Sequence, residues 1–388
     1  METPLNTAKI INKPINGSHS IMSFIRLFVI MLLLGSPMAS WAQTYKVALF
    51  IPEQSPFWSL VTNFMQEAAN DLQVELVVYD AKSNHILMVE QVKQAINGPD
   101  RVDALVIQNF KKTAPIIIQI AEEARVYSYL INAPLRKEDN FGQPREKFKY
   151  WLGEMIPDDT GVAAAITHKL INRAKSTGML ATDGKIKMFA MGGRLADTSS
   201  INRIKGVHQA IATRTDTTLL QVFHTDWREQ DSAQKFDGAW SRYPESKVVF
   251  SASYGITNGI LSNSIISASK AEEHILTNSL GLTEDILKQV KNTQIVATSG
   301  GHYIEGAWAL VQIYDFLNGI DFATESLSRK TLMPIIDQNN VDFFIDKVSN
   351  NKYKKSNLRK IDFTQYSKKL TPSLKHYNFD FKSILFQL

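Results

Sequence analysis

Residues 46–58, KVALFIPEQSPFW, decide the fold of this chain. Apart from Lys46, the first six residues are apolar, which predicts a short buried strand. From Trp58 to residue 72, apolar residues recur at helical spacing, so an amphipathic helix follows the strand within a few residues. This pair is the unit from which parallel sheets are built.

The same alternation continues along the chain. Further strands are predicted over 74–79, 104–108 and 126–131, with helices over 86–96 and 115–124. A charged stretch at 136–150 and a short extended piece at 150–153 interrupt it. A second series then has helices over 161–174, 200–212, 229–242 and 258–269 and strands over 186–191, 219–224, 247–251 and 294–298. A helix over 304–317 and a strand over 332–336 follow. We expect an α/β protein of two similar halves with parallel sheets, joined near 132–156.

Composition excludes several classes of protein. The chain has 388 residues, 43 Lys+Arg against 38 Asp+Glu, and no cysteine. Disulfides, Cys-ligated zinc, iron–sulfur clusters, a Cys nucleophile and lipid attachment at cysteine are therefore excluded. A nucleophile elbow, a phosphate-binding loop and closely spaced histidine ligands are also absent. We therefore expect no enzyme, no metal and no cofactor, and the modest net charge of +5 does not favour nucleic acid.

The N-terminus predicts export. Arg26 precedes eight consecutive apolar residues, 27–34, and small residues follow at Ser40 and Ala42. This pattern predicts a signal peptide cleaved after Ala42. A membrane anchor is the alternative, but the run is shorter than the ~20 residues that span a bilayer. Residues 1–21 form an upstream extension, and the mature chain 43–388 is expected in the periplasm.

Ligands of open parallel sheets bind beyond the carboxyl ends of the strands. In this sequence those positions carry aromatic and neutral hydrogen-bonding residues, which suits a small, polar, largely uncharged molecule. The candidates in the strand-end loops are Ser55, Phe57, Trp58, Asn109, Asn132, Trp227, Ser253, Tyr254 and His302. Of Phe57 and Trp58, one is expected to pack between helix and sheet and the other to face Trp227 across a flat ring.

Two further candidates are charged. Arg203 starts a helix after the Gly192-Gly193 turn and is predicted either to pair with the ligand or to bind nearby carbonyl groups. Asp158 is predicted to cap the helix that begins near Gly161, a position from which it can also face the cleft.

The opening segments resemble type I periplasmic binding proteins, the sugar-type solute receptors that include ribose-binding proteins and autoinducer-2 receptors. The resemblance covers roughly 45–345 and rests on 46–52, the Ser-Pro-Phe-Trp turn at 55–58, VELVVYD at 74–80, VDALVI at 102–107, Arg203 with Gly206, 247–250 and 333–336. It implies two Rossmann-like lobes, a hinge, and a ligand trapped by hinge closure.

The resemblance also assigns residues. Ser55, Phe57 and Trp58 match the first-lobe ligand turn, and Arg203 matches a ligand arginine of the autoinducer-2 receptors. Asn132 stands where sugar receptors have Asp, Ser253-Tyr254 replaces an Asn-Asp pair, and Ile201 replaces an arginine of pentose receptors. The chain passes from Ser299 directly to His302, which lies close to where relatives bring a Gln or Arg to the ligand.

The expected lobes are 45–132 with about 303–330, and about 156–298. The hinge is expected at 133–155 and 299–302, with a C-terminal extension at 340–388. The expected function is capture of a sugar or related polyol by a monomer that delivers it to the permease of an ABC transporter. The alternative is a sensory receptor acting on a membrane kinase, cyclase or chemoreceptor.

Overall fold

The computed structural model describes residues 44–263, 275–348 and 355–388. The predicted signal peptide and upstream extension lie outside these residues, as does part of the helix predicted over 258–269. No helix within the described ranges is long and apolar enough to cross a membrane.

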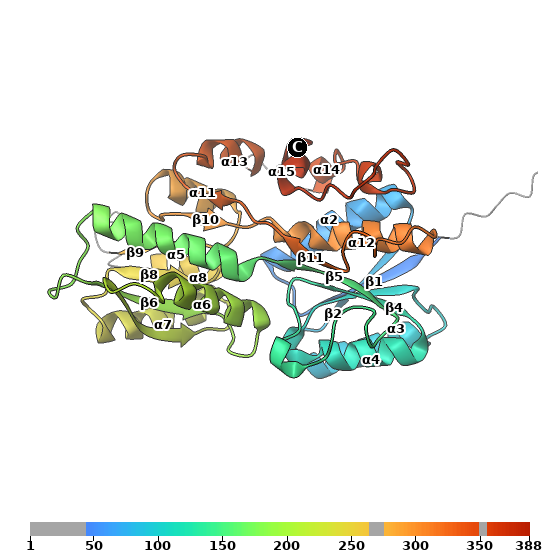
Figure 1. Ribbon diagram of the computed structural model, residues 1–388, viewed down its shortest axis with the longest axis horizontal. Coiled ribbons are helices and arrows are strands. Elements are labelled where there is room, and N and C mark those ends of the chain that lie inside the picture. Colours follow the sequence, from blue (N-terminus) through green and yellow to red (C-terminus); the bar gives the residue numbers. More distant parts are fainter. Residues whose placement is uncertain (1–43, 264–274, 349–354) are drawn as a thin grey trace, which may run out of the picture. The chain divides into compact units, whose positions relative to one another are not determined.

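The first lobe is built on a six-stranded parallel sheet, in the order β11-β5-β4-β3-β1-β2 (Figure 1). Its strands are β1 (Lys46–Ile51), β2 (Glu75–Asp80), β3 (Ala104–Ile107), β4 (Tyr127–Ile131), β5 (Trp151–Pro157) and β11 (Ser328–Thr331). The strands predicted over 46–51, 74–79, 104–108 and 126–131 are confirmed to within one residue at each end.

Helices cover both faces of this sheet because successive strand side chains point to opposite sides. Val47 and Leu49 of β1 join the core formed with α2 (Pro56–Leu72) and α12 (Glu305–Leu317). Ala48 and Phe50 join the opposite core, formed with α3 (His85–Asn97) and α4 (Ala114–Ala124). Two 3-10 turns, η1 (Phe110–Lys112) and η2 (Lys137–Asp139), lie in the connections of this lobe.

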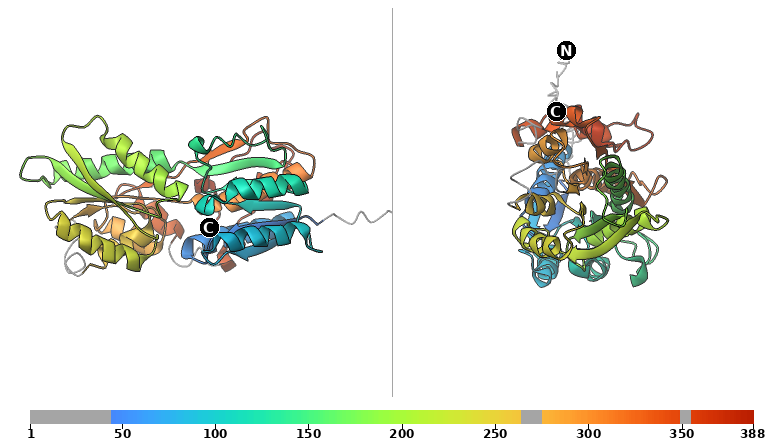
Figure 2. Two further views of the ribbon diagram at one scale, coloured as in Figure 1. Left: turned by 90° about the horizontal axis from the view of Figure 1, so that it is seen from below. Right: turned by 90° about the vertical axis from the view of Figure 1, so that its left-hand side faces the viewer.

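The second lobe has a four-stranded parallel sheet in the order β7-β6-β8-β9. Its strands are β6 (Ile186–Gly192), β7 (Thr217–His224), β8 (Val248–Ser251) and β9 (Leu276–Thr277), and its helices are α5 (Asp159–Ser176), α6 (Thr198–Ile211), α7 (Glu229–Arg242) and α8 (Tyr254–Leu261). Helices α5 and α6 pack side by side, as do α7 and α8, so each sheet lies between helical layers (Figure 2).

The chain passes between the lobes at three places in the described residues. It leaves the first sheet after Pro157, returns between β10 (Thr298–Ser299) and η3 (His302–Ile304), and leaves again between β11 and β12 (Ile335–Ile336). β10 and β12 pair antiparallel. The start of β5 lies inside the predicted hinge stretch 133–155 but pairs within the first sheet, so that crossing comes later than expected.

Several elements depart from the prediction. β9, β11 and α11 (Glu284–Lys291) were not predicted. Of the strand expected over 294–298 only residue 298 is in a strand, and of the strand expected over 332–336 only residues 335 and 336 are. The C-terminal segment contains α13 (Val341–Val348), α14 (Lys355–Leu358), the 3-10 turn η4 (Thr364–Tyr366) and α15 (Phe381–Leu385). Its buried aromatic residues belong to the same core as α2 and α12, so the segment is part of the folded body (Figure 1).

Candidate functional site

The two serines predicted at the site cap helices. Ser55 Oγ accepts a hydrogen bond from the Trp58 backbone N–H at 3.3 Å, and Ser253 Oγ accepts one from the Ile256 N–H at 3.3 Å. Each satisfies an amide that a helix start would otherwise leave unpaired. The caps therefore fix the first turns of α2 and α8, which carry Phe57 and Tyr254.

The Phe57–Trp58 pair divides as predicted in one respect. Trp58 is buried in the core of the first lobe, whereas Phe57 is half-buried. The Phe57 ring packs edge-to-face on Trp58 and lies 4.8 Å from the ring of His302, centroid to centroid. This leaves Phe57 as the member of the pair that can face a ligand.

Arg203 on α6 is the central charged group of the site. Only 5% of it is exposed. Its Nε donates to Asp159 Oδ1 at 2.7 Å, and its Nη1 donates to the Ala252 carbonyl at 2.7 Å. Its guanidinium also lies 5.7 Å from the Trp227 ring, a cation–π distance. The carbonyl interaction predicted for Arg203 is confirmed, and its contact with a ligand stays a prediction.

Asp158 was predicted at the site, but Asp159 is the carboxylate that faces Arg203. Asp158 Oδ1 caps α5 through the Gly161 N–H at 3.2 Å and lies 3.3 Å from the exposed Lys330 ammonium. The cap predicted for Asp158 is therefore confirmed. Asp159, one residue on, is fully buried. Burial raises the pKa of Asp159, and the charge of Arg203 opposes that rise.

His302 and Glu305 lie beside this ion pair. Burial, with the charge of Arg203, holds the pKa of His302 well below its usual value, so the imidazole is neutral. His302 Nδ1 is buried and has no hydrogen-bond partner among the described residues. Burial also raises the pKa of Glu305 well above its usual value, and the charge of Asp159 adds to the rise. The protonated, uncharged form of Glu305 is thereby favoured.

The predicted asparagines hold the backbone around the site. The Asn132 N–H donates to Glu305 Oε2 at 2.9 Å, and Asn132 itself has a left-handed backbone, with φ of 62°. Asn109 Nδ2 donates to the Pro134 carbonyl at 3.1 Å and lies 3.4 Å from Thr198 Oγ1 of the second lobe. Both side chains lie at the predicted edge, but neither is shown to meet a ligand.

Tyr254 begins α8 and is half-buried. Although it belongs to the second lobe, it packs against the core that contains α2 and α12. Burial raises the pKa of its phenol, so the hydroxyl keeps its proton and can donate a hydrogen bond.

Trp227 is held on the second lobe by its neighbours. Its backbone is left-handed, with φ of 76°, and its Nε1 donates to Asp197 Oδ2 at 2.8 Å. The indole lies directly over Gly193, where an added Cβ would come within 2.0 Å of two ring carbons. The Gly192-Gly193 turn thus leaves the space that the indole fills.

Gly193→Ala is therefore expected to push the indole out of place. Overpacking and loss of the Trp227–Asp197 hydrogen bond are expected to lower the free energy of unfolding by about 1–3 kcal/mol. The control is Gly238→Ala in α7, where an added Cβ meets nothing within 4 Å. This variant is expected to gain about 0.5–1 kcal/mol. Urea denaturation followed by tryptophan emission measures both, and equal stability of the two variants would contradict the packing described.

Glu53 and Arg194 form a salt bridge that was not predicted from the sequence. Arg194 Nη2 of the second lobe lies 2.9 Å from Glu53 Oε1 of the first, and Arg194 Nη1 lies 3.7 Å from Asp197. The bridge links the loop after β1 to the residue that holds Trp227. Glu53 lies two residues before Ser55, so proximity to the Ser-Pro-Phe-Trp turn was the available signal.

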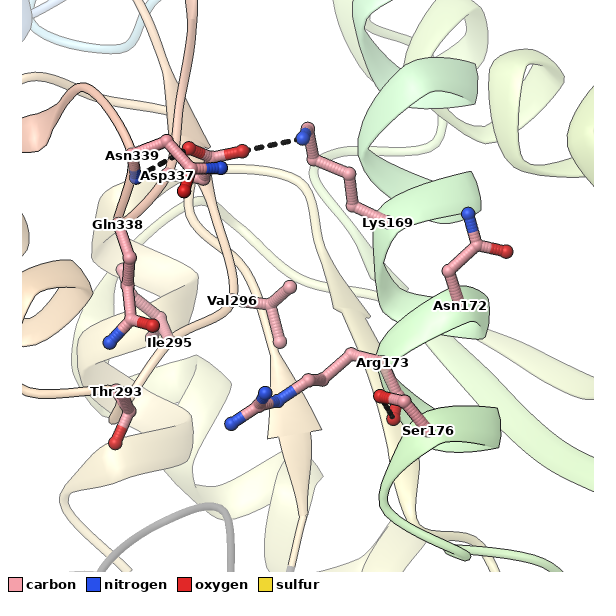
Figure 3. Close-up of a pocket in the computed structure, with 10 residues that line it drawn as sticks. All are labelled: Lys169, Asn172, Arg173, Ser176, Thr293, Ile295, Val296, Asp337, Gln338 and Asn339. Carbon is pink, nitrogen blue, oxygen red and sulfur yellow. Dashed lines mark hydrogen bonds and ion pairs between the residues drawn. The ribbon is translucent and has the colours of Figure 1, made fainter.

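A separate hollow of about 350 Å³ lies between α5 and the segments before β10 and after β12 (Figure 3). Lys169 pairs there with Asp337, and Arg173 extends toward the opposite wall. None of the predicted site residues lines this hollow. The described residues also contain no cluster of three or more His, Asp or Glu side chains able to hold a metal ion.

Phe57 thus lies against His302, and Arg203 lies over Trp227, with Asp159 paired to Arg203. The charge of Arg203 acts on His302, and the buried carboxyl of Glu305 is influenced by Asp159. The model of the periplasmic binding protein domain matches residues 47–321. The chain belongs to this family. Its members are solute-binding proteins of the periplasm, and the two sheet-centred lobes are the type I fold that the sequence predicted.

Solved structures share the fold. A periplasmic sugar-binding protein from Pseudomonas fluorescens is 20% identical, with a TM-score of 0.76 over 88% of this chain and 99% of that chain. An ABC transporter solute binding protein from Bacillus halodurans C-125 with bound myo-inositol is 14% identical (TM-score 0.64, 78% and 98% covered). One from Actinobacillus succinogenes 130z with bound D-allose is also 14% identical (TM-score 0.66, 77% and 100% covered). Comparison with curated protein sequences finds no match.

Proposed function

We propose that this binding protein captures a neutral sugar or polyol between its lobes and delivers it to an ABC transporter. The observation that carries the proposal is the charge balance of the site. Arg203 is already paired with Asp159, His302 is neutral, and burial favours the protonated form of Glu305. Arg203, Asp159, His302 and Glu305 together carry no net charge, and with the hydrogen-bonding groups and aromatic rings around them they suit a polyhydroxylated neutral ligand.

The bound myo-inositol and D-allose of two structural neighbours belong to this chemical class. Ten of the eleven residues predicted at the site remain our proposed ligand set, the exception being Trp58, which packs in the core. Asp159 and Glu305 join the set as residues that balance its charge. We also propose binding without catalysis, and export with cleavage after Ala42. The 340–388 segment contributes buried residues to the core that contains α2 and α12, so it does not by itself favour the alternative of a sensory receptor.

Thermal unfolding of residues 43–388 with pairs of neutral and charged sugars tests the ligand class. The probes are D-allose, D-galactose and myo-inositol, with D-galacturonate and D-galactosamine as charged analogues. A ligand at 100 times its Kd stabilises the folded state by about 2.7 kcal/mol, so a neutral hit raises the Tm. The charged analogues are expected to give much smaller shifts. A preference for a charged analogue, or no shift with any neutral sugar, would overturn the proposal.

Trp227→Ala is expected to weaken binding of the best neutral sugar by at least about 30-fold, since truncation of a buried tryptophan at an interface commonly costs 2 kcal/mol or more. The free energy of unfolding should fall by about 1–3 kcal/mol, because the indole packs over Gly193 and donates a hydrogen bond to Asp197. Trp240→Ala is the matched control, because Trp240 stacks on Phe236 in α7 and is not one of the predicted site residues. Calorimetric titration measures the affinity of both variants. Wild-type affinity in Trp227→Ala would remove Trp227 from the site.

A further inference from the structure

Helix α15 packs against the loop that carries His302. Gly301 has φ of +103°, and a Cβ added there would lie 2.6 Å from Phe381 Cδ1. The Phe381 ring therefore covers the loop backbone directly. The same ring meets Tyr303 edge-to-face, with centroids 5.6 Å apart. Both chain neighbours of His302 thus contact one side chain of the C-terminal helix.

Phe381 is held in place by its own surroundings. Asp380 caps α15, accepting hydrogen bonds from the Lys382 and Ser383 N–H groups at 3.3 and 3.1 Å. Phe381 is 3% exposed, and Ile384 and Leu385 in the next turn are fully buried. Capping and burial together leave the ring little freedom to move away from the loop.

The segment that ends in α15 is tied to the first lobe at several points. Asp315 of α12 accepts hydrogen bonds from the Lys368 N–H at 2.7 Å and from the Tyr377 hydroxyl at 2.9 Å. Asp71 of α2 accepts one from the Phe363 N–H at 2.8 Å. Since Asp315 is fully buried, these hydrogen bonds are shielded from water. The segment is therefore a fixed support for the loop.

The opposite side of the loop faces the site. The imidazole of His302 lies against Phe57, and its buried Nδ1 has no hydrogen-bond partner among the described residues. Gly300 and Gly301 give this crossing more backbone freedom than other residues would. A glycine pair followed by a functional side chain needs an outside contact to fix that side chain, and Phe381 supplies one.

We propose that Phe381 is a positioning residue for ligand binding. Through Gly301 and Tyr303 it holds His302 against Phe57, so that Nδ1 is placed for one hydrogen bond to a hydroxyl group of the ligand. This rests on the proposed function, because His302 is a member of the proposed ligand set. Phe381 lies beyond residue 321, where the family match ends, so a segment outside that match would support the binding site.

Hydrogen exchange tests the positioning step without any ligand. Phe381→Leu is compared with Phe363→Leu, which alters an equally buried phenylalanine of the same segment, one that packs near Tyr366. In Phe381→Leu, the amides of 300–304 are expected to exchange about tenfold faster than in the wild type, as local opening becomes easier. In Phe363→Leu they should change much less. Equal acceleration in both variants, or none in Phe381→Leu, would overturn the proposal.

Titration with the best neutral sugar tests whether Phe381 affects binding through His302. Phe381→Leu and His302→Ala should each weaken binding by about tenfold, which corresponds to one hydrogen bond. In the double variant the loss should stay close to that of His302→Ala alone, because the two changes remove the same contact. Additive losses would overturn the positioning role. If no neutral sugar binds the wild type, the proposed function fails, and the exchange experiment still decides whether Phe381 fixes the loop.

Discussion

Asp159→Asn is expected to lower the free energy of unfolding by about 3–5 kcal/mol, because it leaves the buried guanidinium of Arg203 without its counter-charge. The neighbouring Asp158→Asn is the control. It should cost less than about 1 kcal/mol, since asparagine caps helices as well as aspartate does and the contact of Asp158 with Lys330 is exposed. Urea denaturation at pH 7 measures both variants. Comparable losses would contradict the assignment of Asp159 as the partner of Arg203.

The reciprocal change separates stability from binding. Arg203→Met should destabilise the fold by a similar amount, because Asp159 is then the unpaired buried charge. The double variant Arg203→Met with Asp159→Asn removes both charges and should recover part of the stability. It should not recover affinity for a neutral sugar, because the guanidinium is gone. Wild-type affinity in the double variant would show that Arg203 is structural only.

Much of the first lobe could be predicted because its central strands β1, β3 and β4 are buried on both faces. Such strands are continuous apolar runs, and the helices between them have one apolar face, so 46–131 carries a strong local signal. The stretch 275–299 carries only a weak local signal. β9 and β10 are two residues long, and α11 has eight residues. Elements this short depend on tertiary packing more than on local pattern.

The C-terminal segment was even harder to predict from the local sequence pattern. Its helices have four to eight residues, too short to form alone. They are held by contacts that bridge long separations, such as Tyr377 to Asp315 and Phe381 to Gly301. A pattern confined to neighbouring residues cannot reveal such contacts, so the segment was predicted only as an extension without repeating strands and helices.

The positions of the candidate residues were easier to predict from the sequence than the contacts that each of them makes. Phe57 and Trp227 lie close after strand ends, where parallel strands gather their carboxyl ends, and Arg203 lies in the helix that follows β6. Their contact with a ligand stays a prediction. Asp158 and Asp159 differ by about 100° around the helix axis, and which of them meets Arg203 depends on where α5 begins. That depends on the cap, and the cap uses Asp158. The sequence could therefore name the pair of carboxylates but not the member that faces inward.

Glu305→Gln is expected to change how stability depends on pH. The pKa of Glu305 in the folded protein is raised well above 4.5, mainly by burial. Above pH 4.5 the unfolded chain loses this proton while the folded protein keeps it. Folded-state stability therefore falls as pH rises toward the raised pKa, by about 1.4 kcal/mol per pH unit. Glutamine copies the protonated form, so the variant should gain stability relative to the wild type across that window.

The comparison isolates Glu305 because its neighbours Asp159 and His302 are present in both proteins. The control is Glu90→Gln on the exposed face of α3, where the same substitution changes no buried group. Parallel curves for Glu305→Gln would mean that the carboxyl ionises in place, which would add a negative charge beside Asp159. A site with that excess charge would no longer suit a neutral ligand, so the same measurement tests the electrostatic basis of the proposed function.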